Sequence, residues 1–213
     1  METTLKWPTT DIELSELLGK DGTYKFDATW DEYWELLSEV EYNADYYNHQ
    51  IIATMSYEAD IHSQLAVKFT LIFASAFRER ASFRLFNSNR PVFIEDCAEK
   101  ESGVFISDGM IIALPSEKYE YQPGMSAETT PIVLVEILSK STRSYDYGTK
   151  LPCYKNIPSL QQIIYVEQNK CEIVVLERKA INRWEETTYT NPEDTFEING
   201  QKVSLESIYQ NIV

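Results

Sequence analysis

Residues 131–143 are Pro-Ile-Val-Leu-Val-Glu-Ile-Leu-Ser-Lys-Ser-Thr-Arg, an apolar run that carries one acid and ends in a hydroxyl-rich segment. The apolar part is typical of a buried strand, and the hydroxyls after it are typical of a helix start. Glu136 is therefore expected near the end of a core strand. Because an unpaired buried charge is costly, a carboxylate in that position needs a partner or a metal ion.

A second acid occupies a similar place upstream. Asp108 lies inside the apolar run of residues 104–113, and Lys150 follows Glu136 in a segment typical of a helix. Two carboxylates on neighbouring strands can hold a hard divalent cation, and a nearby lysine can stabilise or activate the attacking water. This pattern favours a metal-dependent phosphodiesterase with all three side chains in one cleft. The alternatives are that Asp108 is a turn residue and that Glu136 is a structural partner of an arginine.

The composition indicates one folded domain with a sizeable core. The chain has 213 residues, of which 43% are hydrophobic and 25% are charged, as is ordinary for a globular protein. The formal net charge of −15 excludes a protein that coats duplex DNA with its whole surface, because that binding depends on neutralising phosphates. A local basic strip nevertheless follows Glu136 and could admit a phosphate chain beside a metal. It consists of Lys140, Arg143, Lys150 and Lys155.

The cysteines and the N-terminus bear on the location. Cys97, Cys153 and Cys171 are widely and irregularly spaced, which fits neither a disulfide framework nor a zinc cluster, so reduced buried thiols are expected. The first residues lack a basic segment followed by an apolar core, and no apolar run is as long as a membrane span. We therefore expect a cytoplasmic protein without membrane association.

The periodicity predicts an α/β (α+β) fold, a curved mixed sheet flanked by helices. The longest helix is expected over residues 59–80, a second over 141–154 with an unfavourable Pro152 inside it, and a short one over 205–209. Strands are expected at 46–56, 83–86, 90–95, 104–113, 131–138, 161–167, 172–177, 182–190 and 195–198.

Residues 1–45 are expected to form a helical N-terminal appendage to a core domain of residues 46–213. Thr10 and Thr29 each precede an apolar stripe in a pattern typical of helix capping. The second stripe consists of Trp30, Tyr33, Trp34 and Leu37. Because this stripe is large for a peripheral helix, we consider a homodimer formed through it, beside the alternative of packing within the same chain.

The segment around Glu136 resembles a known protein family. Residues 135–143, followed by Tyr145-Asp146 and Lys150, are similar to the V-E-x-L-S-x-S-T block of the Uma2 family (the DUF820 group), which precedes a Tyr-Asp pair and a helix lysine. The family also has an I-P-S-L segment, which residues 157–160 resemble, and a Pro-Asp where this chain has Ser107-Asp108. The resemblance extends from about residue 46 to the C-terminus.

Uma2 proteins belong to the PD-(D/E)XK restriction-endonuclease-like superfamily. The resemblance therefore implies a nuclease-like fold and an endonuclease that depends on Mg²⁺ or Mn²⁺ and acts on nucleic acid, with DNA as the expected substrate. It implies that Asp108, Glu136 and the main-chain carbonyl of Ile137 hold the metal. It also implies that Lys150 replaces the lysine of the E-x-K element, whose position Leu138 occupies.

Auxiliary residues follow from the same resemblance. His62 aligns with a histidine typical of the start of the family's helix. Gln50 stands where many members have a glutamate that often joins the metal, and Glu58 is a candidate substitute. Independently of the resemblance, the hydroxyl-rich segment beside Glu136 offers Ser139, Thr142 and Arg143 as candidate phosphate contacts, with helix capping as the alternative role of its hydroxyls. The alternative function is a catalytically silent, nuclease-derived module that associates with proteins, which the net acidity and the neutral Gln50 favour.

Overall fold

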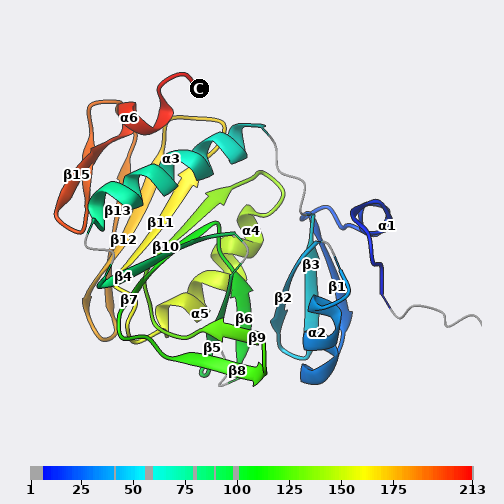
Figure 1. Cartoon of the computed structure of the whole chain (residues 1–213). Helices are drawn as coiled ribbons and strands as arrows, with labels where there is room; N and C mark the ends of the chain where they lie inside the picture. Colours follow the sequence, from blue (N-terminus) through cyan, green and yellow to red (C-terminus); the bar gives the residue numbers. More distant parts are fainter. Residues whose placement is uncertain are drawn as a thin grey trace, which may run out of the picture.

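Two β-sheets and a separate hairpin, with helices packed on them, form the mixed α/β fold that the sequence predicts (Figure 1). The computed structural model describes residues 7–40, 42–55, 60–78, 81–88, 90–97 and 101–212. Within these ranges, the central sheet has six strands in the order β13-β12-β11-β10-β7-β4. Their bounds are Phe83–Asn87 for β4, Gly109–Ala113 for β7, Pro131–Leu138 for β10, Gln162–Glu167 for β11, Ile173–Ala180 for β12 and Arg183–Tyr189 for β13.

The second sheet, in the same described ranges, has seven strands in the order β1-β3-β2-β6-β5-β9-β8, and β14 and β15 pair with each other. These strands are β1 (Thr23–Asp27), β2 (Asn43–Tyr47), β3 (Gln50–Thr54), β5 (Pro91–Ile94), β6 (Gly103–Ile106), β8 (Lys118–Gln122), β9 (Met125–Glu128), β14 (Thr195–Ile198) and β15 (Gln201–Ser204). The sequence did not predict β1, β8, β9 or β15.

Strand β10 positions the acid of the opening motif. It pairs in parallel with β11 and antiparallel with β7, so it lies inside the central sheet. Val135 and Ile137 join the apolar cluster that includes the long helix α3 (Asp60–Ala76). Leu134 and Leu138 join the cluster on the opposite face. Because side chains alternate along a strand, Glu136 points to that opposite face.

Helices cover both faces of the central sheet. Helix α3 buries Leu65, Phe69 and Phe73, the stripe that the sequence predicts, and α6 (Leu205–Tyr209) packs beside it. The opposite face carries three consecutive helical pieces, α4 (Arg143–Tyr145), a π-helical turn η2 (Asp146–Lys150) and α5 (Leu151–Lys155). Pro152 lies in the first turn of α5, where a proline is tolerated. No helix in the described part of the chain is long and apolar enough to cross a bilayer.

Residues 104–113 do not form the single strand that the sequence predicts. Strand β6 ends at Ile106 and belongs to the seven-stranded sheet, whereas β7 begins at Gly109 and belongs to the central sheet. The chain passes from one sheet to the other at Ser107 and Asp108. Two apolar strands joined by so short a connection have the composition of one long strand, which explains the error.

The N-terminal part is not the purely helical appendage that the sequence predicts. Its two helices, α1 (Asp11–Ser15) and α2 (Trp30–Leu37), are present, and each begins with the expected capping box. Between them, however, β1 pairs with β3, and β2 runs across the expected boundary at residue 45. Pairing with a strand from the following segment decides the structure here, which local sequence does not reveal.

The aromatic stripe that suggested a homodimer is packed within the same chain. Tyr33 and Trp34 are buried. The ring of Trp30 lies edge-on to the rings of Tyr46 and Phe93, with centroids 5.2 and 5.8 Å away. The stripe therefore gives no structural reason for a dimer, and the oligomeric state stays an untested prediction.

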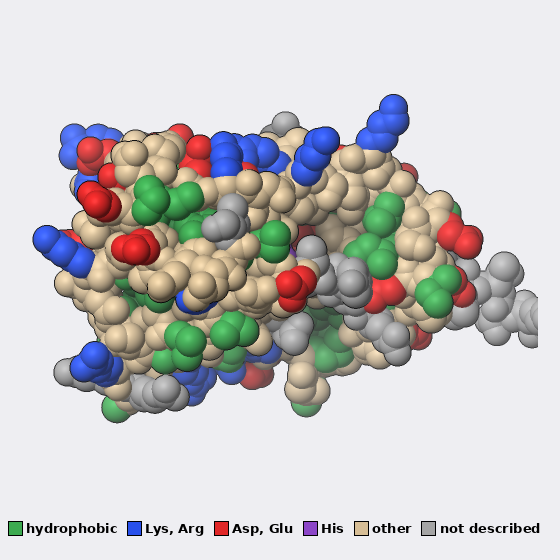
Figure 2. All heavy atoms as spheres, turned by 90° about the horizontal axis from the view of Figure 1, so that it is seen from above, with side chains coloured by type: hydrophobic (Ala, Val, Ile, Leu, Met, Phe, Trp, Pro, Cys, Tyr) green, Lys and Arg blue, Asp and Glu red, His purple; other side chains and the backbone are tan. Residues whose placement is uncertain are grey.

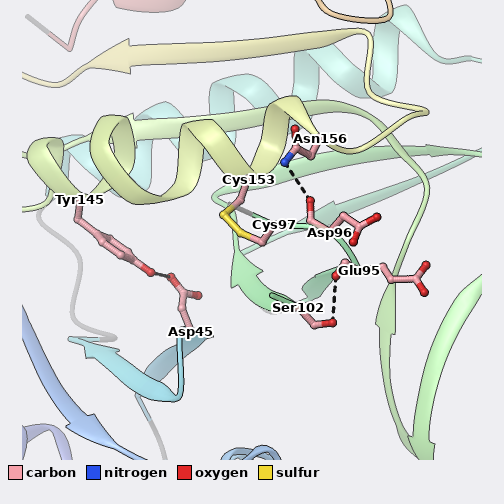
Figure 3. Close-up of a disulfide and its surroundings, with 8 residues drawn as sticks. All are labelled: Asp45, Glu95, Asp96, Cys97, Ser102, Tyr145, Cys153 and Asn156. Carbon is pink, nitrogen blue, oxygen red and sulfur yellow. Dashed lines mark hydrogen bonds between the residues drawn. A yellow bond between two sulfur atoms is a disulfide. The ribbon is translucent and has the colours of Figure 1, made fainter. Parts of the chain in front are cut away.

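Two of the three cysteines are paired, contrary to the expectation of reduced thiols. Cys97 and Cys153 form a disulfide between the segment after β5 and helix α5, with Cα atoms 4.4 Å apart, and Cys171 is free. Nearby, the side-chain amide of Asn156 donates to the carbonyl of Asp96 at 2.9 Å (Figure 3). The two bridged positions are 56 residues apart, and spacing alone cannot show that such residues meet.

We expect reduction of the Cys97–Cys153 bridge to lower the free energy of unfolding by about 2–4 kcal/mol, because a cross-link over a long loop restricts the unfolded chain. Thermal unfolding with and without a reductant measures the effect. The double variant Cys97→Ser/Cys153→Ser is the control, since the reductant should leave its unfolding temperature unchanged. A wild-type protein that is equally insensitive would show that the bridge does not form in solution.

Candidate functional site

A cavity of about 390 Å³ lies where the end of β10, the crossing at Asp108 and the π-helical turn meet. Asp108, Glu136 and Lys150 all line it, so the structure brings these three expected site residues together. The charged side chains of its wall are Asp45, Asp108, Glu136, Asp146 and Lys150. Seen from above, the molecule is hollowed between its N-terminal part and the part built on the central sheet (Figure 2).

Glu136 is almost fully buried in this wall. Its Oε1 accepts a hydrogen bond from the Tyr154 hydroxyl at 2.6 Å and a second from Lys150 Nζ at 3.3 Å. Burial raises the pKa of the Glu136 carboxyl well above its ordinary value, although the Lys150 charge opposes this and the nearby Asp146 adds to it. The sheet thus holds a carboxylate in a place where its negative charge needs compensation.

Lys150 supplies part of that compensation. Its Nζ donates to the carbonyl of Ile106 at 2.8 Å and lies 3.7 Å from Asp45 and 3.6 Å from Asp146. Burial alone would lower the pKa of Lys150, but the surrounding carboxylates, Glu136 foremost, raise it well above its ordinary value. The lysine is therefore a permanent cation at neutral pH.

Asp108 is fixed by its neighbours at the crossing between the sheets. Its Oδ2 accepts a hydrogen bond from the amide of Ile137 at 2.6 Å and lies 3.2 Å from Nε2 of His62. His62 is the third residue of α3, so the expected helix-start histidine does line the cavity. The amide of Ile137 links Asp108 directly to the strand that carries Glu136.

Two further acids of the cavity were missed by the sequence analysis. Asp45, in β2, accepts hydrogen bonds from the amide of Ile106 at 2.7 Å and the hydroxyl of Tyr145 at 2.8 Å (Figure 3). Asp146 lies one turn before Lys150 in the π-helical segment, a type of turn frequent at functional sites. Asp146 could have been found, because it belongs to the Tyr-Asp pair already noted, whereas Asp45 lies in no apolar run and carries no such signal.

Gln50 is not where the family resemblance suggested. Its side chain donates to Asp27 at 2.9 Å, and it does not line the cavity. Asn48 and His49 lie between β2 and β3 with positive φ angles of 53° and 57°, so the chain turns back before Gln50. Asp45, on the strand before that turn, reaches the cavity instead. The candidate Glu58 lies outside the described residues.

The expected phosphate contacts divide into two groups. Ser139 and Thr142 line the cavity, where their hydroxyls are 2.9 Å apart and Ser139 Oγ accepts from the amide of Thr142. Arg143 does not line it. Its guanidinium pairs with Glu167 and lies over the ring of Tyr147 at 5.3 Å. The one arginine among the expected phosphate contacts therefore already has an ion partner, Glu167 at the end of β11.

The donor set of the cavity fits a hard cation. Burial raises the pKa of Asp45 and raises that of Asp146 to about 6, although the charge of Lys150 opposes both shifts. Asp108, Glu136 and the carbonyl of Ile137 offer the oxygen ligands that Mg²⁺ prefers. Within the described residues, no group of three acidic, histidine or cysteine side chains forms a metal site by itself. The other ligands would be water and substrate oxygens, which Mg²⁺ commonly retains.

We expect Asp146 to make the protein less stable as the pH rises. Its pKa is about 6 in the folded chain against an ordinary 3.8, so the folded state binds this proton more tightly than the unfolded state. The free energy of unfolding should therefore fall between pH 4 and pH 6 and level off above. Urea unfolding across this range should show a weaker fall for Asp146→Asn, with the exposed Glu120→Gln as control. An identical slope in the wild type and Asp146→Asn would contradict the assignment.

Comparisons with known proteins place this geometry in a family. The model of the Uma2 family, described as "Putative restriction endonuclease", matches residues 30–206. A crystal structure of a "putative nuclease belonging to DUF820" from Anabaena variabilis is similar, with a TM-score of 0.60 at 13% identity, over 84% of this chain and 98% of that one. At this identity the likeness shows the fold alone. No curated protein matches the chain. Because the family model covers most of the sequence, the chain belongs to the Uma2 family.

Proposed function

We propose that this protein is an endonuclease that depends on Mg²⁺ or Mn²⁺ and hydrolyses phosphodiester bonds of nucleic acid, with DNA as the expected substrate. The observation that supports it most is the meeting of Asp108, Glu136 and Lys150 in one polar cavity. These residues come from three different parts of the chain. Apolar side chains of similar size would usually stabilise the fold as well as or better than such a buried charge cluster, so stability alone does not explain it. A cytoplasmic location is part of the same proposal, although a disulfide is unusual there.

Asp108, Glu136 and the carbonyl of Ile137 are the residues that would hold the metal. A bound divalent ion supplies Lewis-acid chemistry, polarising the scissile phosphate and lowering the pKa of a coordinated water. Contacts within the chain already orient one of these ligands, Asp108. The amide of Ile137 and the ring of His62 fix one oxygen of Asp108, which leaves its other oxygen for the ion.

Lys150 would act on the phosphate and the water by its charge. Its Nζ is anchored by the carbonyl of Ile106, so its remaining N–H groups have a restricted set of directions. Since the surrounding carboxylates keep its pKa well above the ordinary value, it cannot accept a proton from water at neutral pH. Its role would be to orient the attacking water and to offset the charge that develops on the phosphate.

The acidity of the chain favours a second candidate, a catalytically silent module that associates with other proteins. The net charge is −15, and Arg143, the arginine expected to contact phosphate, is paired with Glu167. On the face shown in Figure 2, lysine and arginine side chains stand mainly along its edges. A nuclease of this kind would bind DNA through the metal and a few local contacts, and its binding would weaken only modestly with salt, because the salt dependence grows with the number of phosphates neutralised.

We expect cleavage of DNA by the purified protein to require Mg²⁺ or Mn²⁺ and to be abolished by a chelator or by Glu136→Gln. The amide keeps the shape of the side chain and removes the charge that holds the ion. Single- and double-stranded DNA and RNA should be compared. Glu120→Gln, an exposed site, is the matched control and should remain active. Equal cleavage by wild type and Glu136→Gln would indicate a contaminating nuclease and favour the silent module.

We expect Lys150→Gln to bind the metal at least as tightly as the wild type, because it removes a positive charge from beside the ligands. Cleavage at saturating metal should nevertheless fall by about 100-fold or more, since the lost charge acts in the transition state. Isothermal titration with Mn²⁺ and single-turnover cleavage measure the two effects separately. Lys202→Gln, on the exposed side of β15 and outside the cavity, is the control. An unchanged cleavage rate in Lys150→Gln would remove the lysine from the mechanism.

A further inference from the structure

A tyrosine outside the expected set of site residues reaches the same carboxylate as the lysine. Tyr154 lies in α5, four residues after Lys150, so both side chains leave the same face of the helical segment. Its hydroxyl donates to Glu136 Oε1 at 2.6 Å, and Lys150 Nζ reaches that oxygen at 3.3 Å. Both bonds end on Oε1, and no described residue donates a hydrogen bond to the other carboxylate oxygen, Oε2. One oxygen is thus held by the protein and the other is left for a ligand.

The tyrosine is the firmer of the two anchors. Lys150 divides its charge among Glu136, Asp45 and Asp146, at 3.3 to 3.7 Å. Tyr154 has a single hydroxyl, and its bond to Glu136 is the shortest that the carboxylate makes. A phenol ring also has few rotatable bonds, so little freedom is lost in holding the hydroxyl at one point.

The surroundings of Tyr154 keep its ring in place. The ring is fully buried and meets the ring of Phe105 edge-on, with centroids 6.0 Å apart. The preceding residue, Cys153, is bridged to Cys97. The ring therefore belongs to the apolar core, and its hydroxyl reaches Glu136 from the core side, behind the residues that line the cavity.

We propose that Tyr154 is a positioning residue for the metal: it anchors Oε1 of Glu136 so that Oε2 faces the divalent ion. This inference rests on the proposed function, since it assigns Tyr154 a role toward the ligand Glu136. Groups that orient a metal ligand typically change metal affinity by about 10- to 100-fold when removed. A purely structural tyrosine would instead change stability and leave metal affinity alone.

The variant Tyr154→Phe tests this, because it removes one oxygen and keeps the ring against Phe105. Its dissociation constant for Mn²⁺, measured by isothermal titration, should rise by about 10- to 100-fold. Its single-turnover rate at saturating Mn²⁺ should stay close to that of the wild type, because the ion once bound completes the same site. The effect would therefore appear as a change in metal affinity and not in the chemical step.

Tyr209→Phe is the matched control. Tyr209 is also buried, and its hydroxyl donates to the main-chain carbonyls of Glu167 and Glu172, which are not cavity residues. Both variants should lose some thermal stability, but Tyr209→Phe should bind Mn²⁺ like the wild type. Equal Mn²⁺ affinity in the wild type and Tyr154→Phe would overturn the positioning role alone. Absence of Mn²⁺ binding by the wild type would overturn the proposed function and this inference together.

Discussion

The arrangement of this protein's cavity depends on the ion pairs that the buried Lys150 makes with the carboxylates around it. A cation buried with several carboxylates is costly to form, and it is stable only when its partners are held at fixed positions. Those partners come from separate pieces of the chain: Asp45 from the N-terminal part, Glu136 from the central sheet and Asp146 from the helical segment. The carbonyl of Ile106, at the end of β6, completes the set. A single ammonium group thus ties together both sheets and the helix that covers one of them.

The fold explains why the acid of β10 meets this cation. Alternation along the strand sends Val135 and Ile137 toward α3 and Glu136 toward the helical segment. The same alternation places Leu134 and Leu138 on either side of Glu136, so the carboxylate is open only toward the cavity. The buried carboxylate is therefore a direct result of placing one polar residue on the apolar face of a core strand. Its cost is offset by the donors that the facing helix supplies.

The residues that local sequence could identify are those whose own neighbourhood is unusual. Glu136 and Asp108 stand out as acids within apolar runs, and the capping boxes at Thr10 and Thr29 follow from short-range pattern alone. Asp45 and the bridge between Cys97 and Cys153 depend on which distant segments meet, and no local pattern reveals this. The wrong assignment of Gln50 has the same origin, because a tight turn before β3 decides which side chain reaches the cavity.

The crossing at Ser107 and Asp108, together with the N-terminal position of Asp45, has a consequence for the order in which the molecule is made. Tyr145 and Asp45 are 100 residues apart in the sequence, so forming their hydrogen bond requires closing a very long loop. Proteins rich in contacts between distant residues fold slowly, because a long loop must close before such a contact can form. A chain still emerging from the ribosome can complete neither the cavity nor its charge balance until residue 150 is free. The cavity would then be complete only after the helical segment that carries Asp146 and Lys150 has been synthesised and packed against both sheets.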